Sequence, residues 1–227
     1  IWLGAKAALN HNKPFDQVSR VLAILGWSFP TFVFALLLLL VFYAKLGWFQ
    51  PGQLSTQFSQ EVLKPGFTQY THMMTIDSLL NLRFDIFLDS LRHLIMPVTT
   101  LMVIEVALLL KITRSSMLEE MRQDYVTTAR AKGLPEKMVV NRHIRRNALI
   151  PVITVAGLTL AGLMGGVVIT ETVFNYPGIG SWAAAAAVSL DVLSMLGYAL
   201  FTAVLLVIAN LIVDVMYAVL DPRVRLS

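Results

Sequence analysis

Long apolar runs separated by polar segments set the organisation of this chain. The runs predict four membrane-spanning helices, at about residues 21–46, 94–112, 149–174 and 192–220. Each run is 19 to 29 residues long, and a helix of about 20 apolar residues crosses the ~30 Å of hydrocarbon in a bilayer. A shorter apolar segment, residues 1–9, looks like the end of a helix that begins earlier. We therefore expect an all-α fold, a polytopic transmembrane helical bundle that forms a single domain over residues 1–227.

Proline and glycine positions predict where these helices bend and where they pack closely. Pro30 lies in the first run and Pro97 in the second, and a membrane helix tolerates proline, often with a kink, where neighbours satisfy the freed carbonyl. The third run contains small residues that let helices approach one another: Gly157, Gly162, Gly165 and Gly166. Kinked spans and a tightly packed third span are the expected result.

Lysines and arginines are unevenly distributed between the polar segments. Nine of the eighteen lie in residues 111–148, three in residues 1–20 and two in residues 221–227. Cytoplasmic loops carry an excess of Lys and Arg, so these three segments are predicted to be cytoplasmic. The polar segment 47–92 is then expected outside the cell, and residues 113–148 form the long basic region of the cytoplasmic side.

Composition agrees with a membrane protein and narrows the chemistry. Hydrophobic residues make up 56% of the chain and charged residues 14%, whereas a soluble domain carries about 25% charged residues. Without cysteine, neither disulfides nor thiolate metal sites are available. The histidines show no metal-ligand spacing, and no Gly-x-x-x-x-Gly-Lys-Ser/Thr loop for phosphate is present. We expect no catalytic residue, no metal and no cofactor on this chain, and we attribute its net charge of +4 to membrane orientation.

The basic stretch Asp124–Pro151 carries the most ordered pattern outside the predicted spans. A helix is predicted over 125–132 with Gly133 as its C-cap, and a second helix over 136–147 with Pro135 in its first turn. An apolar stripe runs beside cations: Val126, Ala129, Leu134 and Met138 lie among Arg130, Lys132, Lys137, Arg142, Arg145 and Arg146. Attraction to anionic lipid explains the charges of an ordinary cytoplasmic loop, but it requires no particular order of residues. The order of this stretch favours a docking surface for a partner protein.

Three carboxylates lie within or beside the predicted spans: Glu105, Glu171 and Asp214. Hydrocarbon is costly for a charged group, so such acids face the bundle interior or a watery path. Glu105, near mid-span, is expected to face a path or to pair with a cation of a partner subunit. Glu171, at the outer end, is expected to brace the turn Tyr176–Gly180. Asp214, close to the inner end, is expected to be structural.

Several ordered motifs resemble those of a known family, the membrane permease subunits of bacterial and archaeal ABC importers in their dipeptide/oligopeptide/nickel branch. The resemblance covers nearly the whole chain and rests on these segments: Arg92–Pro97, Thr128–Leu134 with His143 and Arg146–Pro151, Glu171–Phe174 with Tyr176–Gly180, and Asp221–Val224. The segment around Gly133 looks like that branch's form of the cytoplasmic EAA loop. It departs from the general pattern because Thr127-Thr128-Ala129 stands where Glu-Ala-Ala is usual.

The resemblance implies a type I ABC importer permease in the bacterial or archaeal cell (inner) membrane. It implies a coupling helix that sits in a groove of a separate ATP-binding subunit, and the candidate coupling residues are Ala129, Arg130, Lys132, Gly133, Leu134, Met138 and Arg142. Candidate path or gate residues are Glu105, Glu171, Tyr176, Pro177 and Gly178. The implied partners are a second homologous permease, two ATP-binding subunits that hold ATP and Mg, an external solute-binding protein and membrane lipid, with no nucleic acid. Two such permeases would enclose a path for peptides or a related small solute and work by alternating access.

Other functions remain open from the residues alone. An ion-coupled secondary transporter would show paired inverted repeats with broken helices; the kinking prolines fit, but no internal repeat is evident. A structural or assembly subunit would have no conduit of its own. Within the resembled family, nickel chelates and sugars are alternatives to peptides.

Overall fold

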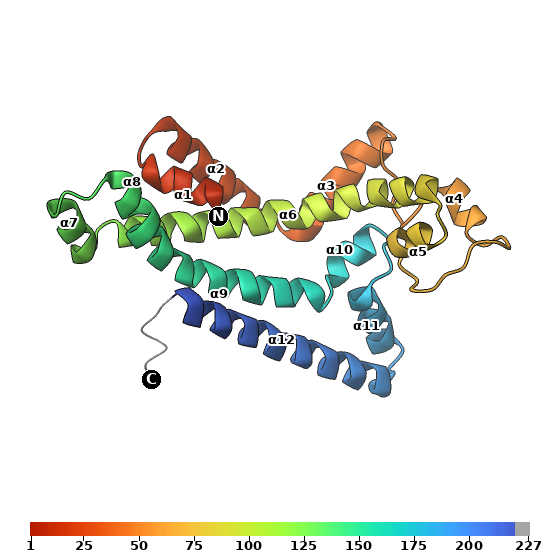
Figure 1. The fold of residues 1–227 in the computed structure, drawn as a ribbon. Helices are drawn as coiled ribbons and strands as arrows, with labels where there is room; N and C mark the ends of the chain where they lie inside the picture. The colour runs from red at the N-terminus through yellow and green to blue at the C-terminus, as the bar shows by residue number, and fades with distance from the viewer. Residues whose placement is uncertain (221–227) are drawn as a thin grey trace. The chain divides into compact units, whose positions relative to one another are not determined.

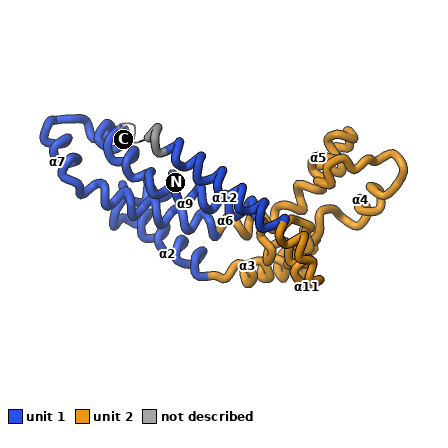
Figure 2. Tube along the Cα trace, turned by 90° about the horizontal axis from the view of Figure 1, so that it is seen from below, with its two compact units in different colours: residues 1–28, 104–165, 197–227 blue, residues 29–103, 166–196 orange. Residues whose placement is uncertain are grey.

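The structure, a computed structural model, describes residues 1–220, with side chains for residues 1–216. Within that range every regular element is a helix. Contacts divide the chain into two compact units (Figures 1 and 2). Unit 1 consists of residues 1–28, 104–165 and the residues from 197 onward, and unit 2 of residues 29–103 and 166–196. Each unit has hydrophobic clusters of its own.

Unit 1 holds the long apolar helices. Its elements are α1 (Trp2–Leu9), α2 (Pro14–Ser28), the second part of α6 (Phe84–Glu120), α7 (Asp124–Ala131), α8 (Glu136–Met138), α9 (Arg145–Met164) and most of α12 (Val192–Leu220). A π-helical segment, Val139–Ile144, joins α8 to α9. The three pieces therefore form one 29-residue helix, Glu136–Met164, which begins in the basic stretch and continues into the predicted third span.

Small residues allow the helices of unit 1 to pack closely. A Cβ atom on Gly4 of α1 would lie 2.7 Å from the carbonyl oxygen of Leu110 on α6. A Cβ atom on Gly157 of α9 would lie 2.2 Å from a methyl group of Val213 on α12, and Val213 is buried. The predicted close approach of the third span to a neighbour is thus seen at Gly157, where only glycine fits without movement of Val213.

A buried ion pair fixes α2 to α6 in unit 1. Asp16 is 1% exposed and accepts hydrogen bonds from Arg114, with 2.5 Å from Nε to Oδ1 and 2.8 Å from the guanidinium NH2 group to Oδ2. The backbone N–H of Asn12 donates to the same carboxylate at 3.0 Å. A buried charge needs such partners, because removing one of them leaves the other uncompensated.

Unit 2 is built from shorter helices. These are α3 (Thr31–Leu38) with a π-helical continuation (Leu39–Lys45), α4 (Thr56–Glu61), α5 (Met74–Leu80), the first part of α6, α10 (Val168–Val173) and α11 (Ile179–Val188). The segment predicted to be external, residues 47–92, is ordered around buried Leu54, Val62 and Ile86. Within this segment Arg83, the residue before α6, forms an ion pair with Glu61 of α4 at 2.5 Å.

Asp77 closes a polar loop in this segment. It is fully buried, and its Oδ1 accepts hydrogen bonds from the backbone N–H and the hydroxyl of Thr71, both at 2.8 Å. Burial raises the pKa of the Asp77 carboxyl, but hydrogen bonds with Thr71 and with the backbone of Tyr70 and His72 together outweigh burial, so this pKa lies below its usual value. The loop before α5 is therefore held by an ionised side chain.

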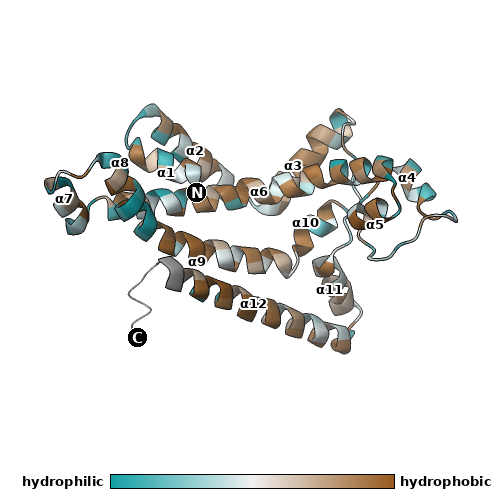
Figure 3. Ribbon diagram, in the orientation of Figure 1, coloured by the Kyte–Doolittle hydropathy of each residue, from teal (hydrophilic) through white to brown (hydrophobic). Residues whose placement is uncertain are grey.

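The predicted membrane fold is confirmed, but the helices begin and end elsewhere than predicted. Among the described residues, three helices are long and apolar enough to span a bilayer: Phe84–Glu120, Glu136–Met164 and Val192–Met216. α2 and α3 would add a fourth only if counted together across the break at Phe29 and Pro30. Figure 3 shows apolar residues along α9 and α12. The first predicted span, 21–46, is thus two helices rather than one kinked helix.

The third predicted span, 149–174, is also divided. α9 ends at Met164, and α10 starts at Val168. Gly166 between them has a φ of +103°, and a Cβ atom there would lie 2.5 Å from the backbone nitrogen of Gly180. Both the backbone conformation and the close approach require glycine. In contrast, Pro97 lies inside the 37-residue helix α6 without ending it.

Candidate functional site

The basic stretch folds as a short helix, a glycine turn and a second helix. α7 ends at Ala131, and Gly133 adopts a φ of +74°. The N–H of Gly133 donates to the carbonyl of Arg130 at 2.9 Å, and the N–H of Leu134 donates to that of Ala129 at 3.4 Å. This pair of hydrogen bonds is a Schellman motif, which satisfies carbonyls at a helix C-terminus and favours glycine at the left-handed position. Pro135 occupies the N-cap position of α8, and its carbonyl accepts hydrogen bonds from the N–H groups of Met138 and Val139, so the backbone is fixed on both sides of the turn.

The apolar side of α7 faces the chain's own core. Val126 is fully buried and Ala129 is 6% exposed, and both belong to a cluster with Met117 of α6 and Ile144 of the following helix. Leu134, half-buried, packs against the same cluster. The stripe was predicted to belong to a docking surface for a partner protein. In the structure Ala129 instead holds α7 in place, because its side of the helix packs against Met117 and Ile144.

The opposite side of the segment is exposed and basic. Arg130 forms an exposed ion pair with Glu136 at 2.8 Å, and the hydrogen bond to Glu136 holds the pKa of Arg130 above its usual value. Lys132 and Arg142 are also exposed. Met138 is 42% exposed, so it is the candidate coupling side chain that offers apolar surface outward. In Figure 3 hydrophilic residues gather on α7 and α8.

Tyr125, at the start of α7, connects three helices. Its hydroxyl donates a short hydrogen bond to Glu120, the last residue of α6, and accepts one from Nδ2 of Asn147 on α9 at 2.9 Å. Burial and the hydrogen bond to Glu120 raise the pKa of Tyr125 to about 12. The phenol therefore remains a hydrogen-bond donor at neutral pH. No role was predicted for Glu120 or Asn147 as individual residues, since no local pattern shows that they lie close together.

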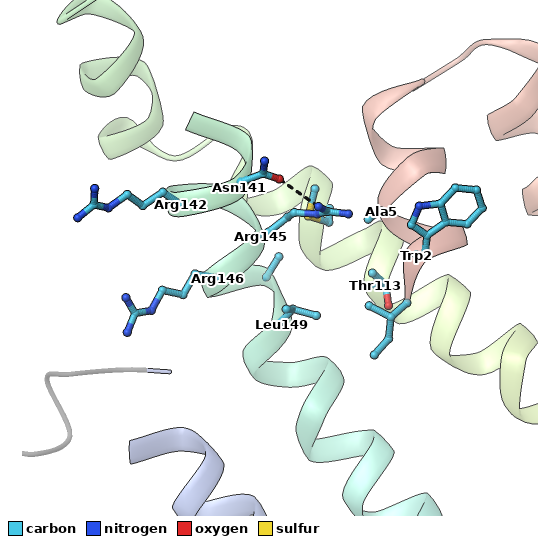
Figure 4. A pocket seen from close by; sticks show the side chains of 11 residues that line it. Trp2, Ala5, Thr113, Asn141, Arg142, Arg145, Arg146 and Leu149 are labelled. Carbon is cyan, nitrogen blue, oxygen red and sulfur yellow. Dashed lines mark hydrogen bonds between the residues drawn. The ribbon is translucent and has the colours of Figure 1, made fainter. Parts of the chain in front are cut away.

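An open pocket of about 1030 Å³ lies beside this segment (Figure 4). It is lined by Ile1, Trp2, Ala5, Thr113, Met117, Asn141, Arg142, Arg145, Arg146, Ala148 and Leu149. Arg145 donates to Oδ1 of Asn141 at 3.0 Å, whereas the side chain of Arg142 extends away from Trp2 and Ala5. The cation predicted at position 142 thus lines the pocket while its exposed side chain extends away from α1.

The candidate gate residues of unit 2 form one hydrogen-bonded turn between α10 and α11. Glu171, 9% exposed, accepts hydrogen bonds from the backbone N–H of Val167 at 3.0 Å and that of Ser181 at 2.6 Å. A Cβ atom on Gly178 would lie 2.5 Å from the Glu171 carboxyl carbon. The Glu171 carboxylate therefore braces the turn, and only glycine leaves room for it at position 178.

The turn also borders a polar pocket. About 530 Å³ in volume, this pocket is lined by Glu171, Thr172, Asn175, Tyr176, Pro177 and Ser181. Burial raises the pKa of the Tyr176 phenol. The structure thus brings Glu171, Tyr176, Pro177 and Gly178 together. Glu105 belongs to unit 1, where it is half-buried and interacts with Thr159 of α9.

The structure also locates Asp214 and His143, two further residues that the sequence analysis singled out. The motif Asp221–Val224 lies outside the described residues. Asp214 is exposed on α12 and His143 is half-buried. Within the part of the chain that the structure describes, no group of three or more His, Cys, Asp or Glu side chains could hold a metal ion.

Comparison with known proteins gives these features a common context. The family model of the binding-protein-dependent transport system inner membrane component matches residues 1–226. The di/tripeptide transport system permease protein DppB of Pseudomonas aeruginosa (strain UCBPP-PA14) is 42% identical over 223 residues, which cover 98% of this chain and 64% of that relative.

Two further relatives are also named as permease proteins of peptide transport systems. The dipeptide transport system permease protein DppB of Escherichia coli (strain K12) is 35% identical, over 98% of this chain and 65% of the relative. The oligopeptide transport system permease protein AppB of Bacillus subtilis (strain 168) is 36% identical, over 96% of this chain and 62% of the relative. The chain thus spans less than two thirds of the length of these relatives. It belongs to the family of binding-protein-dependent transport system inner membrane components, as a multi-pass, all-α protein of the inner membrane.

Proposed function

We propose that this chain is a permease subunit of an ATP-driven importer that receives peptides from an external binding protein. The relatives described above are named as di/tripeptide, dipeptide and oligopeptide permeases, which supports a peptide substrate. With three or four candidate spans, one copy supplies half of a translocation path, and a second homologous permease supplies the other half. Solute passes by alternating access between the two faces of the membrane.

The observation that carries this proposal is the construction of the segment around Gly133. α7 is held by buried Val126 and Ala129, and the Schellman turn at Gly133 fixes its direction. A helix so fixed acts as a lever, since a push on its exposed side moves the helices behind it. ATP and Mg are bound by two separate ATP-binding subunits, and these subunits grip the exposed side.

Coupling is assigned to the two faces of this segment by what each face contacts. Ala129, Gly133 and Leu134 set the position of the lever. Arg130, Lys132, Met138 and Arg142 form the outward surface that meets the ATP-binding subunit. The three cations of this surface, Arg130, Lys132 and Arg142, form a basic rim. Such a rim pairs with acidic side chains on the partner and directs the encounter.

The turn around Glu171 is assigned to the translocation path as a gate. Its buried carboxylate and the glycine at position 178 allow one compact arrangement of Tyr176 and Pro177. Since such a turn has few alternative packings, movement of α10 and α11 would open it as a unit. Glu105 is assigned to the path as a membrane-embedded acid with a polar neighbour, Thr159.

The decisive test is transport by the full-length chain in proteoliposomes with its partner permease, ATP-binding subunits and binding protein. Peptide uptake is expected to require ATP and to survive collapse of proton and sodium gradients. Uptake driven by an ion gradient alone would refute the proposal in favour of a secondary transporter. Absence of substrate crosslinks to any helix of the chain would favour a structural subunit.

A charge reversal tests the lever. Arg130→Glu is expected to abolish uptake while ATP hydrolysis and membrane insertion remain, because the outward rim loses its complementarity to the partner. Lys13→Glu is the matched control: it changes the net charge equally at an exposed position of the predicted cytoplasmic side, and uptake should persist. Normal transport by the Arg130 variant would show that the lever is assigned to the wrong segment.

A further inference from the structure

The cytoplasmic ends of α6 and α9 are joined by two polar contacts, one helical turn apart on α6. The hydroxyl of Ser116 donates to the carbonyl of Ala148 at 2.9 Å. Four residues further along α6, Glu120 accepts from the hydroxyl of Tyr125, which also accepts from Asn147 at 2.9 Å. The first contact joins α6 and α9 directly, and the second joins them through α7.

The Tyr125 hydroxyl differs in kind from the other contacts that hold α7. Only residues 121–123 separate α6 from α7. Val126 and Ala129 hold α7 by apolar packing, which is non-directional. The far end of α7 has the ion pair Arg130–Glu136, which joins α7 to α8. The Tyr125 hydroxyl, on a side chain that is 37% exposed, is the polar contact that joins α7 to both α6 and α9. A hydrogen bond weakens steeply when its angle changes, so the Tyr125 contacts fix the direction of the helix as well as its position.

We infer that Tyr125 is the positioning residue that connects the coupling helix α7 to α6 and α9, so that a relative movement of these two helices turns α7. This inference rests on the proposed function in assigning α7 to coupling. The hydroxyl is sensitive to the positions of both helices, because it donates a hydrogen bond to α6 and accepts one from α9. Loss of either partner frees the start of α7 while its apolar anchor stays in place.

The structural test measures the spread of α7 orientations in the full-length chain within its assembled complex. This chain contains no cysteine, so spin labels can be placed at Thr127→Cys on α7 and Leu158→Cys on α9, both exposed positions. We expect one narrow distance distribution, which Tyr125→Phe and Asn147→Leu each broaden. The double variant should be no broader than either single variant, because both remove the same connection. Glu120→Gln keeps an acceptor for the hydroxyl and should keep the distribution narrow.

A matched control removes a phenol hydroxyl elsewhere. Tyr43 is exposed, and within the described residues its hydroxyl has no hydrogen bond. Tyr43→Phe should leave the distance distribution unchanged. An unchanged distribution in Tyr125→Phe would overturn the inference, whatever the transport result.

The functional readout is the amount of solute transported per ATP hydrolysed. Tyr125→Phe removes both hydrogen bonds of the hydroxyl, so we expect it to lower this ratio at least about fivefold, the factor that corresponds to one hydrogen bond of ordinary strength. A broadened distribution with an unchanged ratio would support positioning by Tyr125 and would refute the assignment of α7 as the lever. The failure of the inference and the failure of the proposed function are therefore distinguishable.

Discussion

Gly133 offers the cleanest perturbation of the coupling segment, because its substitution by alanine tests backbone conformation alone. Its φ is +74°, and a Cβ atom at this position would have no neighbour within 4 Å. Gly133→Ala therefore adds no steric clash with the rest of the chain. What it changes is the cost of the left-handed conformation that the Schellman turn requires.

The size of the effect follows from that conformation. A left-handed residue with a Cβ atom costs about 1–2 kcal/mol, and the turn opens more often by the corresponding factor, about 5- to 30-fold. Asparagine visits the left-handed region more readily than alanine does, so Gly133→Asn should have a smaller effect. Gly133→Pro should have the largest, because proline fixes φ near −65° and removes the N–H that donates to Arg130.

Amide hydrogen exchange of the peptide covering residues 124–138 measures this opening. We expect the exchange rate to increase from glycine through asparagine and alanine to proline at position 133. Exchange within α12 should stay unchanged and serves as an internal control. The ratio of transport to ATP hydrolysis should fall in the same order. Equal exchange rates for the alanine and asparagine variants would refute the reasoning, since both carry a Cβ atom and the expected difference comes from how readily each adopts the left-handed conformation.

Three further predictions concern other parts of the chain. Glu171→Gln should lower stability by about 1.5–3 kcal/mol, the value of a hydrogen bond to a charged group, measured as the melting temperature of the purified protein; an unchanged temperature would argue against the brace. Gly157→Ala should cost about 1–3 kcal/mol through overpacking, because its Cβ would lie 2.2 Å from Val213, and Val213→Ala in the same chain should restore most of the loss. Hydrogen bonds outweigh burial and lower the pKa of Asp77, so its contribution to stability is complete above the ordinary carboxyl pKa and is lost as the pH falls through the lowered value. Asp77→Asn should reduce the acid sensitivity of thermal unfolding, and equal acid sensitivity would count against this role.

The sequence predicts the fold class because bilayer thickness allows few solutions. An apolar run of about 20 residues can satisfy its backbone in hydrocarbon only as a helix or within a closed barrel. The end of α9 could not be predicted in the same way. Gly166 breaks the helix where Gly180 approaches it, and this contact joins residues distant in the sequence. Several glycines occur in that span, and periodicity does not tell a glycine that breaks a helix from one that packs it.

The candidate site was predictable to the same limited degree. Gly133 and Pro135 together mark this turn in the sequence, since each residue restricts the backbone locally. The direction of the apolar stripe was not readable, because a stripe shows that one side of α7 is covered without showing what covers it. Tyr125 meets Asn147 across 22 residues of sequence and Asp16 meets Arg114 across 98. Contacts of that range depend on the packing of α2 against α6 and of α7 against α9, which no local pattern encodes.

The burial of Ala129 changes how the segment must work. If the apolar stripe were the docking surface, a partner would have to pull α7 from its core before it could bind. Under the proposed function, with Val126, Ala129 and Leu134 already covered, the partner would meet Met138 and the basic rim while α7 stays attached to α6 and α9. Binding and force transmission would then use opposite sides of the helix–turn–helix segment, which is the arrangement a lever requires. In this proposal the charged side determines which partner docks, and the apolar side together with Tyr125 determines which helices move.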